Sequence, residues 1–246
     1  MYNLVVFASG NGSTLQSIID AIDKKELHSK IVLVVSNNPD AFALERAKKA
    51  NIPTYVIKNK NYQDIDNELY EVLSHYDINL IVLAGYLKLI GDKLLSNYTI
   101  INTHPSLLPK YGGKGMHGMH VHKAVIDAKE KQSGVTVHYI NNEYDKGNII
   151  SQTVVDVLET DTPETLASKV QAAEKIQLVN VIKKFETGKL WCPNGVSWDQ
   201  ICLGHFYDET KCPKQIWSQL TQRPQSDNFF NARKFLQYLF YNLNYH

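Results

Sequence analysis

Short runs of apolar residues alternate along the chain with longer segments in which apolar residues recur every three or four positions. The short runs are typical of buried strands, and the longer segments predict amphipathic helices. The first part of the chain predicts strands over 4–8, 31–35, 54–57, 80–84 and 99–102, and helices over 14–24, 41–50 and 65–76. Strands that alternate with helices in this way predict βαβ units and a mostly parallel sheet.

The pattern changes after a glycine-rich stretch. It predicts a helix over 121–128, and then two strands, 134–140 and 148–156, in which apolar and polar residues alternate. We expect these two strands to extend the sheet in antiparallel fashion. A last long helix is predicted from Thr162 as N-cap, with Pro163 at its first position, to about residue 185. The fold class is therefore α/β, with a Rossmann-like, mostly parallel twisted sheet flanked by helices.

The character of the sequence changes again after Lys189. Residues 190–246 carry all three Trp and all three Cys residues. The segment ends in a helical pattern with one apolar stripe, made of Phe229, Ala232, Leu236, Leu239 and Leu243. Such a stripe needs burial against its own core or another subunit. We therefore predict a domain over 1–189 and a small aromatic-rich extension over 190–246, the latter a candidate for homodimer contact.

Composition narrows the class of protein. Of 246 residues, 43% are hydrophobic and 21% charged, as in ordinary globular proteins, and the net charge of +1 gives no field for nucleic acid or an anionic membrane. The three cysteines are odd in number and form no CxxC pair, which favours reduced thiols. No apolar run approaches membrane-spanning length. We expect a cytoplasmic protein with no membrane or nucleic-acid partner.

The first candidate chemistry lies where the strand near residue 102 ends. Asn102 and His104 are two residues apart, so in extended backbone both side chains point to the same face, and Pro105 ends the strand. Ligands of open α/β sheets bind at the carboxyl ends of strands. An amide donor beside an imidazole suits the stabilisation of an oxyanion and the transfer of a proton. A turn in which both side chains satisfy local backbone groups is the alternative.

The second candidate is the loop between the first strand and the first helix, which reads Gly10-Asn11-Gly12-Ser13-Thr14. Glycines before a helix let backbone N–H groups approach an anion, and the hydroxyls add donors. The loop lacks the third glycine of a dinucleotide fingerprint, since Leu15 stands there, and it lacks the Gly-Lys-Ser/Thr of a P-loop. A single phosphate monoester fits it best. A tight glycine turn with a helix cap is the alternative.

Two further loops carry polar residues. His117, His120 and His122 lie within six residues, but no partners with the spacing of a zinc site accompany them, so we expect no metal. His138 lies on a predicted strand that can face the same crevice as His104. Asp145 follows in a turn, where it can approach His104, raise the pKa of that histidine and accept a proton.

Together these motifs resemble those of a known family. Gly-Asn-Gly-Ser near the N-terminus, Asn-x-His-Pro-Ser-Leu-Leu-Pro from Asn102, and Gly-x-Thr-x-His from Gly134 followed by Asp-x-Gly at Asp145 occur in the order typical of the folate-dependent formyltransferases. The similarity is greatest to the glycinamide ribonucleotide transformylase family and runs from Leu4 to about Leu190.

The resemblance implies a role for each site. The implied catalytic residues are Asn102, His104 and Asp145; the implied phosphate-binding residues are Gly10, Asn11, Gly12, Ser13 and Thr14; the implied contacts to the rest of the acceptor are Gln171 and Glu174; and the implied folate-binding residues are Tyr86, Leu87, Lys88, Leu89, Ile90 and Ile140. The implied reaction needs 10-formyltetrahydrofolate as co-substrate and no metal.

By this resemblance the protein is a transferase of purine biosynthesis. The primary amine of glycinamide ribonucleotide attacks the formyl carbon directly, and the site residues stabilise the tetrahedral oxyanion. The extension over 190–246 keeps an alternative open, because formyltransferases that act on nucleotide-linked amino sugars share the three catalytic residues and often carry an appendage. A non-catalytic scaffold is a third reading, although a scaffold needs neither the three polar residues nor the phosphate loop.

Overall fold

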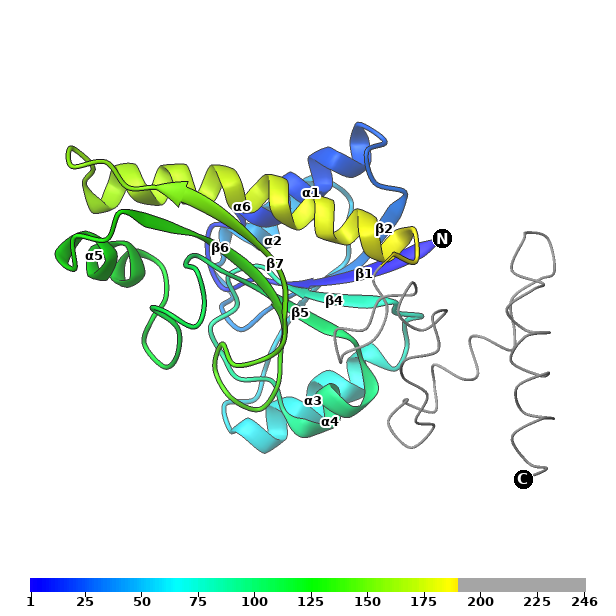
Figure 1. Cartoon of the computed structure of the whole chain (residues 1–246). Helices are drawn as coiled ribbons and strands as arrows, with labels where there is room; N and C mark the ends of the chain where they lie inside the picture. The colour runs from blue at the N-terminus through cyan, green and yellow to red at the C-terminus, as the bar shows by residue number, and fades with distance from the viewer. Residues whose placement is uncertain (190–246) are drawn as a thin grey trace, which may run out of the picture. The chain divides into compact units, whose positions relative to one another are not determined.

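The apolar runs form the strands of one twisted sheet in residues 1–189, the part of the chain described in this computed structural model (Figure 1). The strands are β1 (Tyr2–Phe7), β2 (Ser29–Ser36), β3 (Thr54–Val56), β4 (Leu80–Leu83), β5 (Ile100–His104), β6 (Gln132–Tyr139) and β7 (Ile149–Asp156). The helices are α1 (Ser13–Asp23), α2 (Phe42–Lys49), α3 (Tyr62–Leu73), α4 (Asp92–Asn97), α5 (Met119–Asp127) and α6 (Pro163–Glu186).

The sheet has the strand order β3-β2-β1-β4-β5-β6-β7. The strands from β3 to β5 run parallel, whereas β6 pairs antiparallel with β5, and β7 antiparallel with β6. This confirms the Rossmann-like α/β class and the antiparallel extension. Because β1, β4 and β5 are parallel neighbours, the loops that follow them emerge at one edge of the sheet.

Alternate residues of β1 show how two faces of the sheet are covered. Leu4 and Val6 belong to a buried cluster that includes residues of α1, α2 and α6, whereas Val5 and Phe7 belong to a second cluster with residues of α3 and α4. Figure 1 shows α6 and α1 on one side of the sheet and α3 and α4 on the other. The period of two along a strand thus places helices on both faces.

The long helix α6 begins where the sequence predicts. Its N-cap Thr162 accepts a hydrogen bond from the N–H of Thr165 at 3.3 Å, and the Thr165 hydroxyl accepts one from the N–H of Thr162 at 2.9 Å. This reciprocal pair satisfies two of the N–H groups that a helix start leaves free. Pro163 occupies the first helical position, as predicted.

Some local features differ from prediction, among them α3, which begins and ends three residues earlier than predicted. Helix α4 was not predicted, because it has six residues and only Leu94 is buried, too little to set up a periodic pattern. Strand β5 extends to His104, two residues beyond the predicted end. The predictions for 190–246, including its apolar stripe and homodimer contact, lie outside the described residues. In the described part of the chain, no helix is both long and apolar enough to cross a membrane.

Candidate active site

Three loops meet at the carboxyl edge of the parallel strands. The loop after β1 touches the loop after β4, where the N–H of Ser9 donates to the carbonyl of Gly85 at 3.1 Å and the N–H of Leu87 donates to the Ser9 hydroxyl at 3.2 Å. Strand β5 ends beside them with Asn102 and His104. The topology therefore gathers the predicted motifs at one edge, as expected for a ligand site of an α/β sheet.

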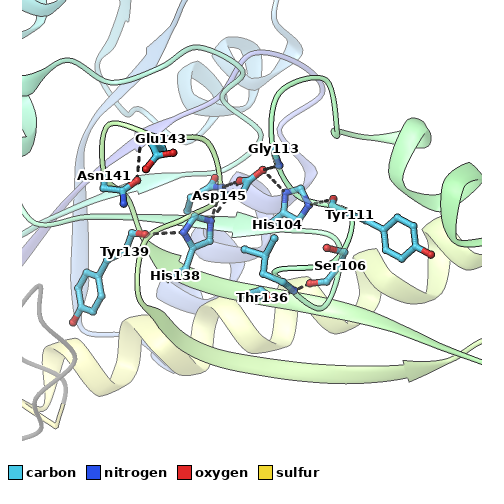
Figure 2. A network of polar contacts seen from close by, with 12 residues as sticks. His104, Ser106, Tyr111, Gly113, Thr136, His138, Tyr139, Asn141, Glu143 and Asp145 are labelled. Carbon is cyan, nitrogen blue, oxygen red and sulfur yellow. Dashed lines mark hydrogen bonds and ion pairs between the residues drawn. The ribbon is translucent and has the colours of Figure 1, made fainter. Parts of the chain in front are cut away.

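Asp145 joins the two polar side chains of β5. Its Oδ2 lies 3.4 Å from His104 Nδ1, and its Oδ1 lies 3.5 Å from Asn102 Nδ2, which donates to it. The N–H of Gly113 also donates to Oδ2, at 2.9 Å. Figure 2 shows Asp145 between the two histidines, with Gly113 above it. The predicted grouping of Asn102, His104 and Asp145 is thus present in the structure.

The contacts of His104 fix which nitrogen carries a proton. Its Nε2 lies 2.8 Å from the carbonyl oxygen of Tyr111, and a carbonyl can only accept, so Nε2 is the donor. The other nitrogen, Nδ1, faces Asp145. Because the imidazole is held on both sides, its N–H direction is set by the loop that contains Tyr111.

His138 completes the cluster from β6. Its Nδ1 donates to the carbonyl of the next residue, Tyr139, at 2.7 Å. A neutral imidazole has one donor and one acceptor nitrogen, so Nε2 accepts from Asn102 Nδ2 at 3.1 Å. The same Nε2 lies 3.7 Å from Asp145 Oδ1. The antiparallel register places Asn102 opposite His138, which explains why a residue 36 positions away shares the site.

Burial governs the electrostatics of His104 more than its carboxylate neighbour does. Burial lowers the pKa of His104, and the nearby Asp145 opposes this effect without outweighing it. The sequence predicts that Asp145 raises the pKa of His104, and it does, but burial outweighs this effect because only 5% of the side chain is exposed. For Asp145 itself, burial raises the pKa, but contacts with His138, His104 and the N–H of Gly113 together lower it.

The loop residues around Asp145 have unusual backbone geometry. Asp145 has φ of +58° and Tyr111 has φ of +56°, in the left-handed region that residues with side chains rarely adopt. A Cβ placed on Gly147 would lie 1.8 Å from the carbonyl oxygen of Tyr139, so only glycine fits there. Such constraints at one turn fix the direction in which Asp145 points.

The loop after β1 presents donors and hides its acceptors. Each of four successive carbonyl oxygens accepts a hydrogen bond: Ser9 from Asn38 Nδ2 at 3.4 Å, Gly10 from the N–H of Ala43 at 3.1 Å, Asn11 from Arg46 Nε at 2.9 Å, and Gly12 from the N–H of Gln16 at 2.9 Å. Within the described residues, no acceptor is found for the backbone N–H groups of 10–14. No side chain caps α1, whose N-cap is Gly12 at φ +73°. This arrangement suits an anion.

Helix α6 brings Glu174 to both parts of the site. Burial raises the pKa of Glu174 to about 7, and the hydroxyls of Thr103 and Thr14 act in the opposite direction. Thr14 belongs to the loop after β1, and Thr103 lies between the two polar residues of β5. Gln171, three residues before Glu174, is exposed. Glu174 is therefore near Thr14, at the start of α1, and near Thr103 of β5.

The predicted folate segment divides into buried and exposed residues. Tyr86 is 7% exposed and packs edge-on against Phe7 with ring centroids 5.2 Å apart, and burial raises the pKa of its hydroxyl. Ile90 is buried, whereas Leu87 and Lys88 are exposed. Leu89 and Ile140 are half-buried, and Ile140 packs against the same cluster as Tyr86. The segment therefore offers both a wall and an accessible rim.

The histidine-rich loop shows no metal site. Among residues 1–189, no group of three or more His, Cys, Asp or Glu side chains is placed to hold a metal ion. His117 and His120 pack edge-on against each other, and His122 is buried in α5. The expectation that the reaction needs no metal stays a prediction.

Comparisons with known proteins agree on one family. A model described as formyl transferase matches residues 2–182. A chloroplastic phosphoribosylglycinamide formyltransferase of Arabidopsis thaliana is 40% identical over 185 residues, which cover 73% of this chain and 63% of the relative. The chain thus spans under two thirds of that relative's length. The phosphoribosylglycinamide formyltransferase of Escherichia coli is 34% identical over 80% of this chain and 92% of its own length.

Solved structures give the same result. The phosphoribosylglycinamide formyltransferase of Coxiella burnetii superposes with a TM-score of 0.74 and 40% identity, covering 81% of this chain and 94% of that one. A glycinamide ribonucleotide transformylase of Symbiobacterium toebii superposes with a TM-score of 0.72 and 32% identity, covering 78% of this chain and 91% of that one.

Proposed function

The chain belongs to the formyl transferase family, and from that membership we propose that it transfers the formyl group of 10-formyltetrahydrofolate to the primary amine of glycinamide ribonucleotide. This is a step of de novo purine synthesis. One observation carries the proposal. The loop after β1, which presents only donors and suits a phosphate, lies at the same sheet edge as the joined side chains of Asn102, His104 and Asp145. We assign this activity to residues 1–189.

The acceptor binds through its phosphate and its sugar. Backbone N–H groups of Gly10, Asn11 and Gly12, with the hydroxyls of Ser13 and Thr14, hold the phosphate at the start of α1. Gln171 and Glu174 contact the ribose and glycinamide portion from α6. Glu174 supports this role because it is half-buried on α6 and near Thr14 of the loop after β1.

The folate binds along the loop after β4. Tyr86 and Ile90 form the fixed wall, since both are buried in the core, and Leu87 and Lys88 form the accessible rim. Leu89 and Ile140 complete the pocket. This pocket lies beside the end of β5, because β4 and β5 are parallel neighbours in the sheet.

The reaction is direct attack of the amine on the formyl carbon. A new C–N bond forms, the carbonyl electron pair moves to oxygen, and the C–N bond to the folate then breaks. Asn102 Nδ2 and His104 Nε2 donate to the oxyanion, which replaces the Tyr111 carbonyl as the acceptor for His104. Asp145 takes the proton of the amine and passes it to His104 Nδ1, while His104 Nε2 gives its own proton to the departing folate nitrogen, so the imidazole stays neutral and the carboxylate is regenerated. No covalent enzyme intermediate is needed.

A lowered pKa for His104 alters one detail of this chemistry. The imidazole is mostly neutral near pH 7, so it acts on the oxyanion through its Nε2–H bond and not through a full positive charge. Asp145 keeps its negative charge, because its pKa is lowered. A charged base next to a neutral donor suits removal of the amine proton.

The test is a turnover assay with purified full-length protein. It offers 10-formyltetrahydrofolate with glycinamide ribonucleotide, and in separate reactions with nucleotide-linked amino sugars. We expect turnover with the ribonucleotide alone. Turnover only with an amino sugar would show that glycinamide ribonucleotide is not the acceptor. The names of the relatives reported above do not favour that outcome. Folate binding without any turnover would indicate the scaffold reading.

A further inference from the structure

Arg46 of α2 makes three hydrogen bonds to the loop after β1 and the helix that follows. Its Nε donates to the Asn11 carbonyl at 2.9 Å, one terminal nitrogen donates to Asn11 Oδ1 at 2.9 Å, and the other donates to Gln16 Oε1 at 3.1 Å. The guanidinium also lies over the Phe42 ring, 4.8 Å from its centroid. One side chain thus uses its planar fork on two oxygens of a single residue.

This contact fixes the orientation of the Asn11 side chain. A guanidinium has only donors, so the atom it meets must be the amide oxygen and not the amide nitrogen. Since Oδ1 is held by Arg46, the Nδ2 group of Asn11 is directed to the opposite side, where it can donate. The backbone carbonyl of Asn11 is held by the same guanidinium. Both Asn11 oxygens are therefore kept from an anion at the loop.

The rest of α2 supports the same geometry. The N–H of Ala43 holds the Gly10 carbonyl at 3.1 Å, and a Cβ on Gly12 would lie 2.7 Å from Ala43 Cα, so the helix is in close contact with the loop. These two contacts come from the backbone and would persist in a side-chain variant. The Arg46 contacts, in contrast, come from a side chain and are removed by a substitution.

We infer that Arg46 is a positioning residue for the acceptor phosphate: it orients Asn11 so that the loop after β1 presents donors alone. This inference rests on the proposed function. Without Arg46, the two oxygens of Asn11 are free to face the phosphate, where they repel it. The loss falls on binding of the phosphate-bearing acceptor, because no contact of Arg46 reaches the residues of β5 or the loop after β4.

The experiment compares Arg46→Met, Arg46→Lys and the control Lys49→Met in the full-length protein. Lys49 is on the same helix and its Nζ lies 5.8 Å from the centroid of the same Phe42 ring, so its substitution removes one positive charge without touching the loop. We expect Arg46→Met to raise the KM for glycinamide ribonucleotide roughly tenfold or more, with kcat and the KM for the folate close to wild type. The KM of Arg46→Lys for glycinamide ribonucleotide should fall between those of wild type and Arg46→Met, because an ammonium keeps the charge but cannot form the planar fork.

Calorimetry with ribose 5-phosphate tests the inference apart from turnover. Wild type and Lys49→Met should bind this probe equally, Arg46→Met should bind it roughly tenfold more weakly, and ribose without phosphate should not distinguish the variants. Equal binding by Arg46→Met and wild type would overturn the inference. So would parallel losses in kcat, folate KM and melting temperature, which would indicate a merely structural residue. If the wild type binds the probe but does not formylate the ribonucleotide, the proposed function fails while the role of Arg46 stands or falls on calorimetry.

Discussion

His104 lies between a carboxylate and a backbone carbonyl, and these two neighbours decide what its nitrogens can do. Nε2 must donate, since it meets the Tyr111 carbonyl, while Nδ1 faces Asp145. The side chain is 5% exposed, so water does not compete for either position. A donor that is already oriented and dry is the kind that stabilises a developing oxyanion most effectively.

Removal of the imidazole should therefore remove chemistry and leave binding. We expect His104→Ala to lower kcat on the order of 10²–10⁴-fold, because the oxyanion loses a donor and the leaving group loses its acid. Folate affinity, measured by fluorescence titration, should stay near wild type. His28→Ala, at an exposed position, is the control. Substantial turnover in His104→Ala would contradict the assigned role.

The pKa of His104 gives a second prediction at the same scale. Burial lowers this pKa and Asp145 opposes the effect, so Asp145→Asn should lower it further. A histidine whose pKa is lowered by folding contributes its full stability at pH values above the ordinary histidine pKa. This contribution is lost as the pH falls through the lowered pKa of the folded protein. Asp145→Asn should therefore widen the pH range over which acid removes stability through His104, so that the loss continues to lower pH than in wild type. NMR titration of the imidazole measures the shift.

Glu143→Gln is the control for this titration, since it removes a charge from the same loop. Glu143 is exposed and pairs with Lys146 at 2.6 Å, not with His104. The His104 pKa should be the same in this variant as in wild type. A His104 pKa that is unchanged or higher in Asp145→Asn would show that the carboxylate does not act on the imidazole as described.

At the scale of elements, the loop after β1 contains two glycines, and only one of them is in close contact with α2. Gly12 has φ of +73°, and a Cβ there would lie 2.7 Å from Ala43 Cα, whereas a Cβ on Gly10 would meet nothing within 4 Å. We expect Gly12→Ala to lower the free energy of unfolding by about 1–3 kcal/mol, from backbone strain and displacement of α2. Gly10→Ala should leave it unchanged. Chemical denaturation measures both, and equal values for the two variants would contradict this account.

The elements that the sequence predicted well are those with a repeated pattern. Buried runs such as 31–35 and the capped start at Thr162 carry their own signals, and so does the spacing of Asn102 and His104. Helix α4 is short and was missed. The residues alone predict only that Asp145 can approach His104, and the grouping of both with Asn102 is implied by the family resemblance.

Other parts of the site could not be predicted because they depend on long-range contacts. Arg46 lies 35 residues from Asn11, in a helix whose pattern shows only an apolar face, and nothing local indicates that its guanidinium reaches back. The Tyr111 carbonyl that orients His104 is a backbone atom, without a sequence signature. The lowered pKa of His104 reflects burial, which outweighs the one neighbour that the sequence suggested.

At the scale of the whole molecule, the parallel strands bring distant motifs together and the antiparallel pair adds the rest. Strands β1, β4 and β5 end at one edge, which gathers the donor-only loop, the folate segment and the two polar residues of β5. Strand β6 runs antiparallel beside β5, and the turn between β6 and β7 folds back so that Asp145 lies against Asn102 and His104. The site is thus a product of the point where the sheet changes from parallel to antiparallel.

This architecture predicts the outcome of shortening the chain. Every residue proposed for the site lies between Gly10 and Glu174, and the family match ends at residue 182. We therefore expect a fragment of residues 1–189 to fold and to keep the turnover of the full chain per protomer, measured by circular dichroism and steady-state kinetics. The sequence makes the apolar stripe of 190–246 a candidate for a homodimer contact, and on that hypothesis light scattering should give a dimer for the full chain and a monomer for the fragment. An unchanged oligomeric mass would remove the dimer role from the extension. A folded fragment without turnover would show that the extension contributes to the site, and an unfolded fragment would show that the boundary at 189 is wrong.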